Sequence, residues 1–116
     1  MSIFTDAVTA TTEKALAGVS LRQKVTANNI ANMATPGFKA SRVDFESDLA
    51  AAVAAGQPDS AQFSLGTADT PVGPDGNNVS LDAENSILVK SGLQYDALVA
   101  ALNYKFATLR IAITGQ

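Results

Sequence analysis

Residues 28–39, with the sequence NNIANMATPGFK, divide the chain into a helical first part and a turn-rich second part. Pro36 biases Thr35 away from the α-helical region of backbone space, so a helix that enters this stretch has to end before the proline. Pro36 and Gly37 suit the two central positions of a type II turn, because the second of these positions needs a positive φ. Phe38 is then expected to begin an extended segment.

Three asparagines, Asn28, Asn29 and Asn32, stand close together at the start of this stretch. Asparagine is a mediocre helix former because its side chain competes for backbone hydrogen bonds. On a helix, the three amides would lie on adjoining parts of one surface. One interpretation is a fraying helix end, where asparagine is tolerated. The other is that the amides, which carry donors and acceptors, bridge to a partner helix and fix its register.

The stretch as a whole resembles the N-terminal signature of bacterial flagellar rod, hook and hook-associated axial proteins. A second block, residues 75–82 with the sequence DGNNVSLD, leads into a long helical pattern. With the short length of the chain, this combination is most similar to the flagellar basal-body rod proteins. The resemblance covers residues 1–46 and 75–116, and the basic, His-containing segment expected between them is absent because the chain has no His.

The resemblance implies a structural subunit of the flagellar proximal rod, the drive shaft of the basal body, which transmits torque and is no enzyme. The implied partners are copies of itself, other rod proteins, the MS-ring and rod-adaptor proteins, and the flagellar type III export apparatus. The implied location is the periplasmic rod, reached without a cleaved signal peptide. We expect an assembly and turn motif made of Asn28, Asn29, Asn32, Thr35, Pro36, Gly37 and Phe38.

Apolar periodicity predicts one long helix at each end of the chain. Residues 5–33 form the first, and residues 81–114 form the second, where Ser80 can cap its start. The apolar residues of the second helix advance by three or four positions at a time. The expected helix-packing residues are Val8, Ala15, Val19, Ile30, Tyr95, Leu98, Leu102, Phe106, Leu109 and Ile113.

Residues 34–80, between the two helices, are expected to be turn-rich and partly extended. Residues 38–49 should begin as an extended segment, residues 48–55 favour a short helix that ends at Gly56, and residues 62–65 are the one plausible strand of the loop region. The sequence therefore predicts a mainly α fold with a single domain, residues 1–116. Its long terminal helices should form an elongated, coiled-coil-like antiparallel pair.

Composition excludes several function classes. The chain has no Cys and no His, so it cannot carry a Cys-His or Ser-His nucleophilic site. A formal charge of −3 argues against nucleic-acid binding. The acidic residues Asp44, Glu46 and Asp48 fit a solvated face better than a metal site, and residues 75–78 fit a turn better than a calcium loop. No cofactor and no small-molecule substrate are expected.

Two other interpretations stay open on the residues alone. A cytosolic helical adaptor that binds a partner helix would show the same helical patterns, whereas an enzyme that uses only carboxylates has nothing specific in its favour. The start of the chain shows no secretory signal, and the longest uninterrupted apolar run, residues 49–55, is too short to span a membrane. Only 16% of the residues are charged, which favours a surface covered by neighbouring subunits.

Overall fold

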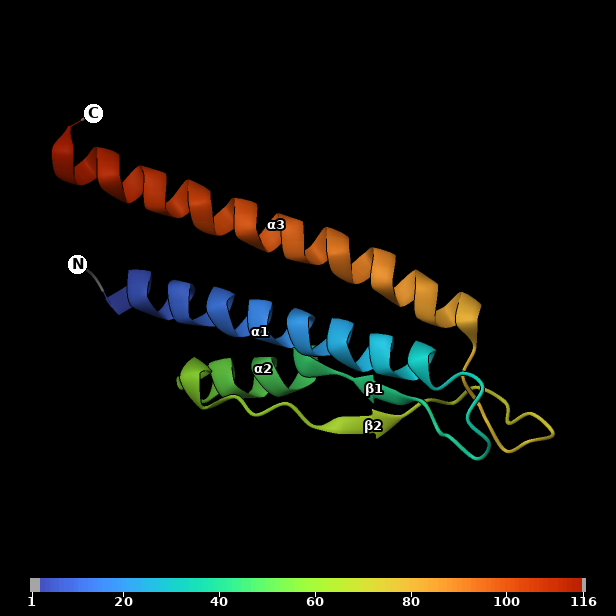
Figure 1. The fold of residues 1–116 in the computed structure, drawn as a ribbon. Helices are drawn as coiled ribbons and strands as arrows, with labels where there is room; N and C mark the ends of the chain where they lie inside the picture. The colour runs from blue at the N-terminus through green and yellow to red at the C-terminus, as the bar shows by residue number, and fades with distance from the viewer. Residues whose placement is uncertain (1–2, 116) are drawn as a thin grey trace.

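Two long antiparallel helices run the length of the molecule, and a smaller layer of helix and strands covers the other side of the first helix (Figure 1). The structure is a computed structural model that describes residues 3–115, so both ends of the predicted 1–116 domain lie outside it. The elements, in chain order, are α1 (Ile3–Ala31), β1 (Ser41–Val43), α2 (Phe45–Ala54), the 3₁₀ turn η1 (Pro58–Ser60), β2 (Leu65–Thr67) and α3 (Leu81–Thr114). The predicted mainly α fold with paired terminal helices is confirmed.

The molecule is elongated, with principal extents of 63 × 29 × 14 Å. Its radius of gyration is 17.8 Å, whereas a compact domain of this length would have about 13 Å. The N- and C-terminal ends of the two long helices lie at the same end of the molecule (Figure 1). An elongated pair of this kind leaves long helical faces available to other molecules.

The boundaries of the long helices follow local capping chemistry. α1 ends at Ala31, two residues before the predicted end, because the chain tightens there: the Met33 N–H donates to the Ile30 carbonyl over 3.1 Å. α3 begins and ends where the periodicity predicts. The Ser80 hydroxyl accepts from the Ala83 N–H, and Gly115 closes the helix with φ 76°.

The middle segment is more ordered than its sequence suggests. β1 and β2 pair antiparallel, with Ser41 opposite Thr67 and Val43 opposite Leu65. The strand predicted at residues 62–65 is therefore misplaced, because pairing with β1 selects Leu65–Thr67 instead. α2 starts at Phe45, earlier than the predicted residue 48, because the Asp44 carboxylate caps it by accepting from the Ser47 N–H.

The core lies where α1, β1, α2 and α3 meet. Val19, Val43 and Phe45 are its buried centre, and Leu98 of α3 packs against them. Gly18 allows this arrangement, since a Cβ at that position would come within 2.3 Å of the Phe45 ring. The remaining apolar residues around this centre are only partly buried: Ala15, Leu21, Val25 and Phe63. A second small buried cluster, Leu49, Ala52 and Ala61, packs against Ala15 and Phe63. Two such small clusters hold the layers together over part of the helices rather than along their whole length.

Candidate functional site

Residues 35–38 form the turn that the sequence predicts. The Phe38 N–H donates to the Thr35 carbonyl over 3.2 Å, which leaves Pro36 and Gly37 at the two central positions. Gly37 has φ +76°, the value that the second central residue of a type II turn requires. No described side chain crowds Gly37, because a Cβ built there meets nothing within 4 Å. The constraint at this glycine is therefore one of backbone conformation alone.

The loop that precedes α3 holds this turn in place. The Asn77 side-chain amide donates to the carbonyls of Asn32, at 2.9 Å, and Thr35, at 2.8 Å. In return the Gly37 N–H donates to the Asp75 carbonyl over 2.9 Å. The bonded residues are up to 45 positions apart in the sequence, and these hydrogen bonds to backbone groups fix the relative position of the two segments without any large apolar side chain.

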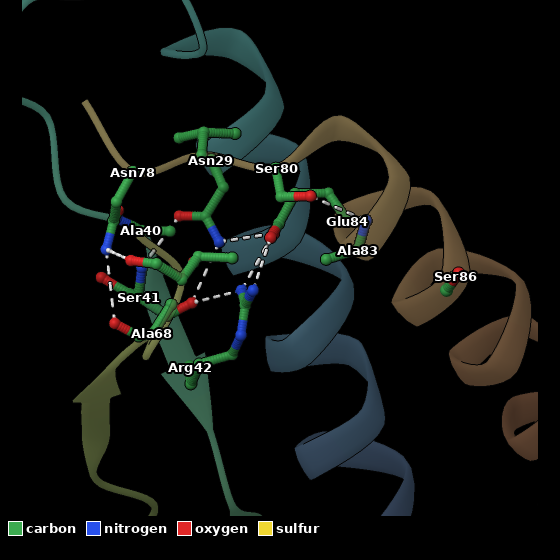
Figure 2. A network of polar contacts seen from close by, with 12 residues as sticks. Asn29, Ala40, Ser41, Arg42, Ala68, Asn78, Ser80, Ala83, Glu84 and Ser86 are labelled. Carbon is green, nitrogen blue, oxygen red and sulfur yellow. Dashed lines mark hydrogen bonds and ion pairs between the residues drawn. The ribbon is translucent and has the colours of Figure 1, made fainter. Parts of the chain in front are cut away.

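Asn78 likewise holds β1 and β2 in place, through hydrogen bonds to the residues that flank them. Its Oδ1 accepts from the Ala40 N–H over 2.6 Å, and its Nδ2 donates to the Ala68 carbonyl over 3.3 Å (Figure 2). Its own N–H donates to the Phe38 carbonyl over 3.2 Å. The side chain is almost completely buried, so this one amide joins the chain after the turn, the segment after β2 and the start of α3.

Asn29 connects α1 to both β1 and α3 (Figure 2). Its Oδ1 accepts from the Ser41 N–H, and its Nδ2 donates to the Ser41 carbonyl, both at 3.0 Å. The same Nδ2 lies 2.7 Å from Oε1 of Glu84 on α3. Arg42 completes the group, because its Nη2 lies 2.7 Å from Glu84 Oε2. Glu84 is fully buried in this arrangement and is charge-paired with Arg42.

The three asparagines of the motif thus have different roles within the chain. Asn29 supports the interpretation in which an amide bridges to a partner helix and sets its register. Asn32 supports the interpretation of a local helix end, since its Nδ2 donates to the Asn28 carbonyl over 2.9 Å and its Oδ1 accepts from the Thr35 hydroxyl over 3.1 Å. Asn28 itself is exposed. The structure therefore brings Asn29 to α3 and leaves Asn28 at the surface.

A second charged group ties α1 to α2. The Arg22 guanidinium donates to Glu46 Oε2 over 2.9 Å and to the Val43 carbonyl over 2.6 Å, and it lies 4.6 Å from the centre of the Phe45 ring. This hydrogen bond from Arg22 lowers the pKa of Glu46 below its ordinary value, although partial burial acts in the opposite direction. The pair therefore fixes the start of α2 on α1.

The predicted helix-packing residues of α3 are buried to very different degrees. Leu98 reaches the core, and Leu102 and Leu109 are half-buried. Phe106 is 49% exposed and Ile113 75% exposed, because α1 and the core contact only part of this helix. On α1, Val19 is buried, Ala15 and Ile30 are half-buried, and Val8 is exposed. Val8, Phe106 and Ile113 can therefore act as helix-packing residues only if another molecule covers them.

α3 also carries an apolar face that the sequence reasoning did not identify. Val89, Leu93, Tyr104 and Ile111 lie on the side away from α1 and are 51–77% exposed. α3 as a whole has the length and mean hydropathy of a helix able to cross a membrane. The sequence could have indicated this outer face, since apolar residues occur on all sides of the helix formed by residues 81–114.

The residues that join the end of α1, the turn, β1 and the start of α3 form a polar junction, and several of them were absent from the predicted site. These are Arg42 and Glu84, which pair with each other, and Asn77 and Asn78, which belong to the block that resembles rod proteins. Arg22, which pairs with Glu46, was also absent, because such pairings depend on the three-dimensional arrangement. Within residues 3–115, no group of three acidic, His or Cys side chains is placed to hold a metal ion. The hydrogen bonds and ion pairs of this site fix the relative positions of two helices and a turn.

Known proteins resemble this chain along most of its length. The sequence model of a family described as flagella basal body rod protein matches residues 11–39, which include most of α1 and the turn. The flagellar basal body rod protein FlgB of Bacillus subtilis strain 168 is 34% identical over 128 residues, which cover 99% of this chain and 98% of that protein. FlgB of Cereibacter sphaeroides is 32% identical, over 82% of this chain and 84% of the relative. FlgB of Escherichia coli K12 is 31% identical, over 71% and 75%.

Proposed function

The chain belongs to the family of the flagellar basal body rod protein FlgB, and we propose that it builds the proximal part of the rod by packing its helix pair against neighbouring subunits. It is a structural subunit of the basal body rod of the flagellum. Its contribution to motility is mechanical, since the rod has to transmit torque without a chemical step.

The observation that carries this proposal is the exposed apolar surface of α3. Leu93 is 67% exposed, Tyr104 77% and Ile111 51%, and these residues lie along one side of a helix of 34 residues. Contiguous apolar surface of this extent is unusual on a soluble monomer and is typical of an interaction site. A rod subunit would cover it with its neighbours, which also accounts for the low charge content.

The partners and the location belong to the same proposal. The chain would contact copies of itself, other rod proteins, and the MS-ring and rod-adaptor proteins at the base. It would be a substrate of the flagellar type III export apparatus and would reach the periplasmic part of the basal body without loss of a signal peptide. We assign it no enzymatic activity, no nucleic acid and no small-molecule substrate.

The turn at residues 35–38 has a defined place in this proposal. α1 and α3 would form the inner part of the rod wall, and Pro36-Gly37 would redirect the chain outward from it. Asn77 would keep that direction, because it holds the carbonyls of Asn32 and Thr35. The junction would thus set the angle at which the layer of α2, β1 and β2 leaves the helix pair.

Electron microscopy of basal bodies tests the proposal directly. A chain with an epitope tag in the exposed loop at residues 71–74 is expressed in cells that lack their own copy, and purified basal bodies are labelled with gold particles against the tag. We expect labelled rods and restored swimming. A stable, soluble monomer that restores no rods and labels no basal body would instead favour the cytosolic adaptor.

A further inference from the structure

An open apolar groove lies between the first half of α1 and α2. Two adjoining pockets form it, with volumes of about 330 and 470 Å³, and both are bordered by Thr11 and Val53. Its floor and walls are small or apolar side chains, and Val8 and Val53 are 53% and 44% exposed. Leu49 and Ala50 extend it along α2. Small residues such as Ala50 allow another helix to approach closely.

The α2 side of the groove is acidic. Residues 44–60 carry four acidic residues and no Lys or Arg. Glu46 borders the groove directly; it is paired with Arg22 of α1 but is still 49% exposed. An occupant should therefore be apolar on one face and should carry positive rather than negative charge beside that face.

The last turns of α3 have these properties. Residues 97–115 contain Lys105 and Arg110 and no acidic residue. Tyr104 and Ile111 lie on the outer face of this segment and are 77% and 51% exposed. They are two helical turns apart, about 10 Å, which fits within the length of about 15 Å of α2. The apolar face and the charge of this segment thus match the groove.

A single chain cannot bring the two surfaces together. α2 lies on one side of α1 and α3 on the other (Figure 1), so the outer face of α3 points away from the groove of its own chain. A second copy can supply the helix end, and its own groove is then open to a third. Such a head-to-tail contact between different surfaces, when repeated, produces a ring or an open helical series rather than a two-fold dimer.

We propose that the C-terminal turns of α3 from a second copy of this chain occupy the groove between α1 and α2. Tyr104 and Ile111 of that copy lie against Val8 and Val53, and its Arg110 lies near Glu46 at the acidic side of the groove. This inference rests on the proposed function and specifies one subunit contact within it.

Engineered cysteines test the contact, because the chain contains no Cys of its own. A Val53→Cys chain is mixed with an Ile111→Cys chain under mild oxidation, and we expect a disulfide-linked dimer. The matched control replaces Ile111→Cys with Val89→Cys, which is 66% exposed on the same outer face but near the start of α3. That mixture should give only background cross-linking. A chain with both Val53→Cys and Ile111→Cys should give a ladder of dimers, trimers and longer products.

Three results would overturn the inference. Equal cross-linking of the Val89→Cys control would show unspecific contact, and efficient dimers from Ile111→Cys alone would show that α3 meets α3. Protection of Ile111→Cys by added phospholipid vesicles, without cross-linking in their absence, would assign this face to a membrane.

Basal bodies separate the inference from the proposed function. If the doubly substituted chain is incorporated into rods but shows no Val53–Ile111 cross-link there, the docking is wrong and the rod function stands. If the unsubstituted chain does not enter basal bodies, the proposed function fails and the docking with it. Arg110→Glu provides a second readout, since it should lower the cross-linking yield several-fold in the Val53→Cys and Ile111→Cys mixture.

Discussion

The side-chain amide nitrogen of Asn29 lies 2.7 Å from Oε1 of Glu84, and both side chains are fully buried between α1 and α3. The two long helices are therefore joined at this end by a polar contact rather than by an apolar one. A buried amide and a buried carboxylate tolerate few alternative positions, because a buried polar group without a hydrogen-bond partner destabilises the fold. We therefore expect this contact to set how α3 is placed along α1.

Replacing Asn29 should loosen that placement. Asn29→Leu leaves the Ser41 N–H without a partner, which should cost about 1–3 kcal/mol. It also removes one of the two hydrogen bonds to Glu84 Oε1, which then keeps only the donor Arg42 Nη1 at 3.1 Å. We expect lower helicity by circular dichroism and faster hydrogen exchange in the first turns of α3. Asn28→Leu is the control, because Asn28 is exposed, and it should change either quantity little. Equal effects of the two substitutions would contradict the role assigned to Asn29.

The long helices could be predicted from the sequence because their signals are local. The period of residues 81–114, the Ser80 cap and Gly115 all act within one helix, and α3 has those bounds. The Pro36-Gly37 turn is local in the same sense. The position of β2 was not predictable in this way, since Leu65–Thr67 is selected by pairing with β1 more than 20 residues away.

The polar junction could be predicted only in part. The asparagine cluster indicated that the end of α1 was unusual, and the block at residues 75–82 indicated a second unusual segment. Nothing in the spacing showed that Asn77 holds the Pro36-Gly37 turn or that Glu84 pairs with Arg42. Such long-range pairs depend on the folded arrangement, whereas periodicity describes a single element.

The isolated chain should be only marginally stable. Its apolar core is small and its shape is elongated, so the area buried offsets little of the ordering entropy. We expect partial helicity, a broad thermal transition and a hydrodynamic radius larger than that of a compact protein of the same length. Circular dichroism and size-exclusion chromatography measure these quantities. A sharp two-state transition from a compact monomer would contradict this expectation.

Acid should weaken the contact between α1 and α2. Arg22 lowers the pKa of Glu46 through its hydrogen bond, so the stabilisation is fully present above the ordinary carboxylate pKa, about 4.5, and is lost as the pH falls through the lower value of the folded state. Since Glu46 is half exposed, the effect should not exceed about 1 kcal/mol. The stability difference between the unsubstituted chain and Glu46→Gln should therefore be constant above the ordinary carboxylate pKa and shrink as the pH falls below it. A difference that stays constant below it as well would show that the pair contributes nothing.

The inner stripe of α3 should be required for assembly. Leu102 is half-buried and Phe106 is 49% exposed in the single chain, and we expect neighbouring subunits to cover both. Leu102→Asp or Phe106→Asp would then place a charge in an apolar contact, so that subunits are made but enter the rod poorly. Swimming assays and counts of rods in purified basal bodies measure this. Asn85→Asp adds the same charge at an exposed position near the start of α3, outside the segment proposed to dock, and should be tolerated. Normal swimming of both stripe variants would show that this face stays uncovered.

Gly37 should be required for rod assembly because of its backbone conformation and not because of its contacts. It has φ +76° and open space around it, so a larger side chain would fit, but a β-branched residue resists this backbone conformation. Gly37→Val should therefore distort the turn, displace Thr35 and Asp75 from their backbone hydrogen bonds, and block rod assembly while synthesis and export continue. Gly66→Val is the matched control: Gly66 has equally open space but lies in β2 without a positive φ, and strands favour β-branched residues. We expect basal bodies with rods from Gly66→Val and rodless basal bodies from Gly37→Val. Equal numbers of rods from the two variants would mean that residues 35–38 are a passive linker.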